Sequence, residues 1–222
     1  MHRSSVRAVC FDLDGTLFDD RQYARAGLER GAAELERRIG VDLTAELLSA
    51  YFDRGIRAAT FDVVLSEAGL PADHVPALVT AYHDGDGALV PYPDAEATLA
   101  ALSADYGIGV LTGGTGGHEK LTRLGLDTHV DECLVTAERD DSKRDADPFV
   151  ELAARLGAAH ESVVYVGDRP ELDFPQPNRL GMTTIRLRRG HYATVAASGD
   201  AVPDIDVDTL RGVRDAVARL GR

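Results

Sequence analysis

Short apolar strands alternate with helices in the second half of the chain, and this alternation restricts the fold more than any other feature. The strand-like stretches are rich in Val and Ile and occur at residues 108–111, 133–136, 163–166 and 183–187. Helical stretches separate them at residues 94–104, 119–124 and 147–156. Short strands that are apolar throughout are typical of a parallel sheet with both faces covered. With a further strand at residues 6–11, we predict an α/β fold: a Rossmann-like parallel sheet core covered by helices on both faces.

The region between the first two strands has a different character. From about Arg21 to Asp84 apolar residues recur at helical spacing, and glycines interrupt the pattern at residues 40, 55 and 69. A strand–helix–strand unit does not need four consecutive helices, so we predict that they form an inserted all-helical cap subdomain. The predicted boundaries are 1–18 and 88–222 for the catalytic core and 19–87 for the cap.

Charge and composition exclude several classes of protein. The chain has 222 residues and a formal net charge of -13, and 22 of its 24 basic residues are arginines. A net-negative protein does not bind nucleic acid non-specifically. No apolar run suggests a membrane span or a signal peptide, so we expect a cytoplasmic protein. We also expect a monomer or a homodimer. The acidic, lysine-poor composition resembles proteins of organisms with molar salt in the cytoplasm; a GC-rich genome that favours arginine codons is the alternative.

Polar residues follow the strands at the points where ligands bind in an open parallel sheet, which are the carboxyl ends of the strands. The first strand ends in two carboxylates that repel each other, Asp12 and Asp14. Thr112 and a glycine-rich turn follow the second, and Asp168 follows a later one. Burying uncompensated carboxylates is costly, so a cation is expected among them. The sequence therefore predicts one acidic, cation-binding site at this edge.

These motifs resemble the haloacid dehalogenase superfamily, in the phosphatase type with a helical cap after the first motif. Residues 12–16, Asp-Leu-Asp-Gly-Thr, match the first motif, and Leu111-Thr112 matches the second. Lys143, with Asp145 and Phe149, resembles the third. Residues 167–173, which run from Gly167-Asp168 to Asp173, match the fourth. The resemblance covers nearly the whole chain, and the first and fourth motifs are its most specific parts.

The resemblance implies a Mg²⁺-dependent phosphatase of a small phosphorylated metabolite that works through an aspartyl-phosphate. Asp12 would be the nucleophile, and Asp14 would protonate the leaving oxygen and later activate water. The metal would be held by Asp12, the Asp14 backbone carbonyl and Asp168. Thr112 and the Gly113 backbone N–H would hold phosphate oxygens, and Lys143 would neutralise charge. Thr16 and Asp173 would support the site, Asp173 through a metal-bound water or by orienting Lys143.

The chain also departs from the family pattern. Gly113 stands where the family often has Asn, which removes one side-chain donor to phosphate, and the glycine-rich loop 113–117 looks shortened. Arg144 and Ala146 replace two prolines next to Lys143, and the ammonium itself is kept. Pro175-Gln176-Pro177 stands where the family often has glycine and alanine, so we expect a different loop path there. A compact ammonium is not replaceable by a planar guanidinium in a tight site, so a lysine in this arginine-rich chain favours a functional role.

Three alternatives to a phosphatase stay open at this point. A dehalogenase of the same superfamily needs neither Mg²⁺ nor a leaving-group acid, so Asp14 and the acids of the fourth motif argue against it. A phosphotransferase or phosphomutase would pass the phosphoryl group to a sugar hydroxyl, and the motifs do not distinguish it. A catalytically silent binding domain is possible on any fold, and the complete set of motif residues counts against it.

Overall fold

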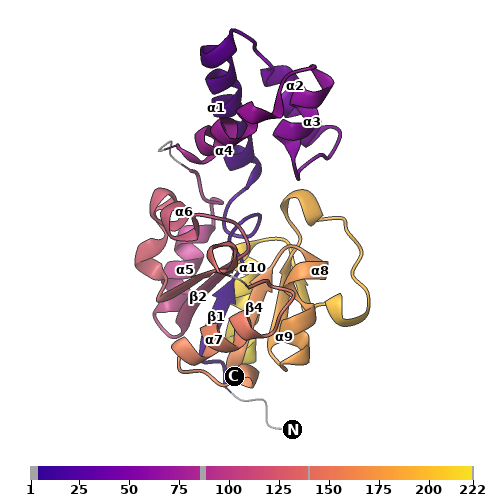
Figure 1. Ribbon diagram of the computed structural model, residues 1–222. Helices are drawn as coiled ribbons and strands as arrows, with labels where there is room; N and C mark the ends of the chain where they lie inside the picture. The colour runs from indigo at the N-terminus through magenta and orange to yellow at the C-terminus, as the bar shows by residue number, and fades with distance from the viewer. Residues whose placement is uncertain (1–4, 86–88, 140, 222) are drawn as a thin grey trace. The chain divides into compact units, whose positions relative to one another are not determined.

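The computed structural model describes residues 5–85, 89–139 and 141–221, and Figure 1 shows its course. The chain divides into two compact units by its internal contacts. One comprises Met1–Asp19 with Ala88–Arg222, and the other is Asp20–Gly87. The exit boundary that we predicted at residues 87 and 88 lies outside the described residues. We describe the two units separately.

The first unit is built on a six-stranded parallel sheet in the order β3-β2-β1-β4-β5-β6. The strands are β1 (Ala8–Phe11), β2 (Gly107–Thr112), β3 (Glu132–Val135), β4 (Val163–Gly167), β5 (Thr183–Leu187) and β6 (Ile205–Val207). The central strand β1 pairs with both β2 and β4 along its whole length, so that Phe11 lies opposite Val110 and Val166. The predicted α/β fold with a parallel sheet is confirmed.

Helices flank this sheet (Figure 1). They are α5 (Ala95–Ser103), α6 (Gly117–Leu124), α7 (Asp147–Arg155), α8 (Pro170–Asp173), α9 (Pro175–Arg179) and α10 (Leu210–Leu220). Because side chains alternate along a strand, Ala8 and Cys10 of β1 point to one face, where they join Phe149 and Leu152 of α7 in a buried cluster. This packing buries one face of β1.

Three local predictions differ from the structure. The first strand begins at Ala8 and not at residue 6, and the helix predicted at 119–124 begins two residues earlier, at Gly117. The proline-rich stretch that starts at Pro175, for which we expected a loop, is the short helix α9. Proline is favoured at the first position of a helix because its fixed φ suits the helix and its missing N–H would have no partner there.

The second unit is entirely helical in its described residues. It contains α1 (Arg21–Ile39), α2 (Thr44–Phe52), α3 (Thr60–Glu67), a 3-10 turn (Ala72–His74) and α4 (Val75–His83). Its core is a cluster of buried apolar side chains that includes Leu28, Leu35, Leu47 and Leu78. Nowhere in the described part of the chain is a helix both long and apolar enough to cross a membrane.

Candidate active site

Three neighbouring strands place the predicted motif residues together. Asp12 follows β1, Thr112 ends β2 and Asp168 follows β4, although these residues are far apart in the sequence. The Asp12 backbone N–H donates to the Val166 carbonyl at 2.8 Å, which continues the β1–β4 pairing to the first motif residue. All three side chains therefore start from one edge of the sheet, as the sequence predicted.

The turn after Asp12 requires a glycine. Gly15 has φ of +90°, in the region that disfavours other residues, and its N–H donates to the Phe18 carbonyl at 3.0 Å. A Cβ atom at this position would lie 2.6 Å from Asp168 Oδ2. Gly15 thus lets the first motif turn tightly while the carboxylate of the fourth motif lies against its backbone.

Asp12 is buried, with 6% of its surface exposed. Its Oδ1 accepts a hydrogen bond from the Lys143 ammonium, and its Oδ2 accepts one from Thr16 Oγ1 at 3.1 Å. Burial raises the pKa of Asp12 from an ordinary 3.8 to about 7; Lys143 opposes the rise, and the carboxylates of Asp173 and Asp14 add to it. Additional positive charge nearby would therefore stabilise the ionised form of Asp12.

Lys143 links two carboxylates. Its Nζ also donates to Asp173 Oδ1 at 2.9 Å, and Asp173 Oδ2 accepts the Arg169 backbone N–H at 2.9 Å. Burial opposes the charged form of Lys143, but Asp12 and Asp173 outweigh this effect and hold its pKa well above the usual value. The ammonium is therefore charged at neutral pH, and it contacts both Asp12 and Asp173.

Asp14 lies in a second ion pair, which the sequence analysis missed. Its Oδ2 accepts a hydrogen bond from Thr112 Oγ1 at 3.0 Å, and its Oδ1 pairs with Lys120 Nζ at 2.6 Å. The Lys120 side chain is 6% exposed, against 23% for that of Asp14. One signal was available: the chain has two lysines, and both lie in this site.

Close packing at the start of α6 places Lys120. A Cβ atom on Gly117 would lie 2.7 Å from Thr112 Cγ2 and equally close to Val135 Cγ2. Glycine therefore lets α6 begin directly against β2 and β3, and Lys120, three residues later, lies on the same side of the helix. Gly113, the predicted phosphate-binding backbone position, is exposed directly after Thr112.

Three carboxylates are close enough to share a cation. Each of Asp12, Asp168 and Asp173 offers one oxygen, and these oxygens lie within 4.8 Å of one another. Thr16 Oγ1 lies 3.5 Å from Asp168 Oδ1 and ties it to Asp12. With Asp14 the site has four carboxylates against the two ammonium groups, a balance of two negative charges that one divalent cation would neutralise. Oxygen ligands of this kind fit Mg²⁺.

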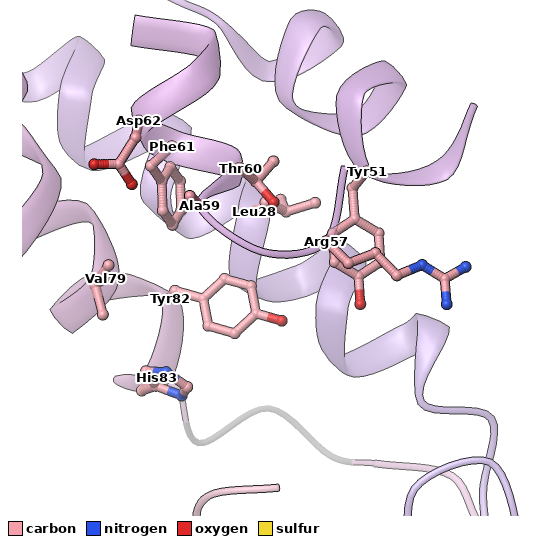
Figure 2. Close-up of a pocket in the computed structure, with 10 residues that line it drawn as sticks. All are labelled: Leu28, Tyr51, Arg57, Ala59, Thr60, Phe61, Asp62, Val79, Tyr82 and His83. Carbon is pink, nitrogen blue, oxygen red and sulfur yellow. The ribbon is translucent and has the colours of Figure 1, made fainter. Parts of the chain in front are cut away.

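The helical unit has a pocket of its own. It has a volume of 230 Å³ and is lined by ten residues, among them Tyr51, Arg57, Phe61, Tyr82 and His83. Figure 2 shows Tyr51 and Arg57 at one end of this pocket and Phe61 and His83 at the other. The Arg57 guanidinium lies 5.6 Å from the centre of the Tyr51 ring. A cation, aromatic rings and an imidazole thus share one concave surface.

Comparisons with known proteins agree on the family. A family model described as haloacid dehalogenase-like hydrolase matches residues 6–181. The glyceraldehyde 3-phosphate phosphatase of Methanopyrus kandleri is 34% identical over 98% of this chain and 99% of its own. The ribulose-1,5-bisphosphate 5-phosphatase of Halopiger xanaduensis is 28% identical over 95% of this chain and 99% of its own.

A solved structure agrees on the fold. The crystal structure of a predicted phosphoglycolate phosphatase from Haemophilus somnus superposes with a TM-score of 0.74 at 20% identity. The match covers 96% of this chain and 98% of that one.

Proposed function

Because the chain belongs to the haloacid dehalogenase-like hydrolases and is a phosphatase, we propose that it cleaves a phosphate monoester through an aspartyl-phosphate on Asp12, with Mg²⁺ as cofactor. The observation that carries this proposal is the environment of Asp12. It is a buried carboxylate that contacts Lys143 and lies in one cluster with Asp168 and Asp173. Asp14, two residues later, lies on the more exposed side of the site.

The proposed reaction has two steps. In the first, a carboxylate oxygen of Asp12 forms a bond to phosphorus while the bond to the leaving oxygen breaks, and Asp14 gives that oxygen a proton. In the second, Asp14 takes a proton from water, whose oxygen attacks phosphorus and releases Asp12 and inorganic phosphate. Lys143 neutralises charge on Asp12 and on the phosphoryl group, and the Thr112 hydroxyl and the Gly113 N–H hold phosphate oxygens.

The carboxylates of the site indicate where Mg²⁺ would bind. Asp12, Asp168 and the Asp14 backbone carbonyl would hold Mg²⁺, and Asp173 would support it through a water or by orienting Lys143. Bound there, Mg²⁺ would supply positive charge that reduces the repulsion between the nucleophile and a phosphate dianion. We also propose a cytoplasmic location and a monomeric or homodimeric state.

We propose that the substrate is a short-chain sugar phosphate. Two relatives are named for glyceraldehyde 3-phosphate and ribulose 1,5-bisphosphate, which both carry a phosphoester on a short carbonyl sugar. The helical unit would act as the cap that selects among such substrates, with the pocket around Arg57 as its contribution. Arg57→Ala should therefore change the ratio of kcat/KM values between two sugar phosphates. Arg54→Ala is the matched control, since Arg54 pairs with Glu67 at 2.8 Å and lies outside this pocket.

The decisive experiment measures release of inorganic phosphate from a panel of phosphorylated metabolites in molar KCl. Wild-type protein should turn over with Mg²⁺ and lose that activity in chelator, and Asp12→Asn should be inactive under both conditions. Isomer formation without phosphate release would identify a phosphomutase instead. A folded wild-type protein that releases phosphate from no substrate on the panel would refute the proposal.

A further inference from the structure

Lys120 is a buried cation that the proposed mechanism does not use. Its Nζ lies 2.6 Å from Asp14 Oδ1, on the opposite end of the carboxylate from the Thr112 hydroxyl. The side chain is nearly as enclosed as that of Lys143, with 6% of its surface exposed against 1%. Placing an ammonium at such a depth is costly, so its position beside Asp14 needs a reason.

We propose that Lys120 is a second active-site cation, which holds the Asp14 carboxylate in the free enzyme and binds the phosphoryl group of the substrate, in place of the side-chain donor that Gly113 lacks. The inference rests on the proposed function. In the proposed mechanism Asp14 gives a proton to the leaving oxygen of the substrate, and Lys120 Nζ donates a hydrogen bond to Asp14. The leaving oxygen is bonded to the phosphoryl group, so the Lys120 ammonium lies within reach of that group.

Charge balance supports this assignment. Four carboxylates, two ammonium groups and one divalent cation sum to zero, so the site carries no net negative charge that would repel an arriving phosphate dianion. Without Lys120 the same site would hold one negative charge before the substrate arrives. Because such interactions are strong in an enclosed site, this single charge should matter for phosphate affinity.

Local geometry connects Lys120 to the shortened glycine-rich turn. Gly117 lets α6 start against Thr112, which places Lys120 over Gly114, where a Cβ atom would lie 3.1 Å from Nζ. Gly113 is different, because the nearest atom to a Cβ there would be Thr136 Oγ1 at 3.9 Å. An asparagine therefore fits at position 113 but not at position 114, and the missing donor can be restored by one substitution.

The test uses Lys120→Met, a double variant that combines Lys120→Met with Gly113→Asn, and the control Arg123→Met. Arg123 lies on the same helix and pairs with Glu119 at 3.3 Å, so its loss removes a cation from α6 and leaves both lysines of the site in place. Calorimetry gives the affinity for inorganic phosphate in the presence of Mg²⁺, kinetics gives kcat and KM, and denaturant unfolding checks the fold.

We expect Lys120→Met to weaken phosphate binding about tenfold or more and to lower kcat/KM about 100-fold, as loss of a preorganised donor does. The double variant should recover about tenfold of that loss, and Arg123→Met should stay within about twofold of wild type. A side chain that only anchors α6 would give a different result: lower stability and kcat, unchanged phosphate affinity and no recovery on adding Gly113→Asn. That result would overturn the inference.

Failure of this inference can be told from failure of the proposed function. If wild type hydrolyses phosphate esters and Lys120→Met binds phosphate as wild type does, the inference is wrong and the function stands. If wild type releases no phosphate but its phosphate affinity depends on Lys120, the proposed hydrolysis is wrong and Lys120 is still a phosphate ligand.

Discussion

Replacing the nucleophile, Asp12→Asn, should stabilise the metal-free protein. Burial raises the pKa of Asp12 from 3.8 to about 7, so the folded protein binds a proton that the unfolded chain releases between these values. Stability therefore falls as pH rises through this window. A difference of about 3 pKa units corresponds to roughly 4 kcal/mol. The asparagine avoids this cost, and its side-chain carbonyl can still accept from Lys143.

The expected gain depends on pH, and this dependence is the test. At pH 8 Asp12→Asn should raise the free energy of unfolding by roughly 4 kcal/mol, and at pH 5 by roughly 2 kcal/mol, because Asp12 is then protonated in the folded wild type. Denaturant titrations at both pH values, in chelator, measure the difference. Asp105→Asn is the control, because Asp105 is an exposed carboxylate of the same unit. A gain that is equal at both pH values, or a loss at pH 8, would mean that Lys143 fully compensates the buried charge.

Three further predictions concern the metal, Lys143 and Gly117. Mg²⁺ should raise the Tm of wild type but not of Asp168→Asn, and its affinity, measured by calorimetry, should fall up to about tenfold per pH unit below about 7, because protons compete for Asp12. An affinity for Mg²⁺ that stays the same between pH 8 and pH 5 would contradict this prediction. Lys143→Arg should lower kcat/KM at least about 100-fold in the phosphate-release assay, because a guanidinium does not fit the enclosed site; retention of a tenth of the activity would argue against it. Gly117→Ala should cost about 1–3 kcal/mol in denaturant unfolding, because its Cβ would meet Thr112 at 2.7 Å, whereas a stabilised variant would show that α6 can move away.

The sequence was most informative where a polar site residue lies directly at the end of a strand. Asp12, Thr112 and Asp168 each lie at the carboxyl end of a strand, so the parallel sheet alone predicts that they meet. Lys143 comes from a longer loop, and the prediction of its place depended on the resemblance to a family. The structure brings it into contact with Asp12 and Asp173.

Lys120 shows what a strand-based interpretation leaves out. Its position depends on where α6 begins and on how closely it packs, and the prediction began this helix two residues late, at residue 119. The contacts of Gly117 with two strands decide otherwise, and such tertiary contacts leave no periodic signal in the sequence. The helix at Pro175 was missed because a proline in the interior of a helix interrupts it, whereas a proline at the first position of a helix is favoured.

The position of β1 at the centre of the sheet has a consequence for how the protein is made. Ala8 pairs with Gly107 on one side and with Val163 on the other, so the strand that carries Asp12 is synthesised long before its second partner. At about 5–20 residues per second, the ribosome needs roughly 8 to 30 s to reach β4 after β1. The helical unit is continuous in sequence and needs no residue of the sheet for its own core. We therefore expect it to fold on the nascent chain while β1 still lacks its second neighbour, so that the site is completed in the last third of translation.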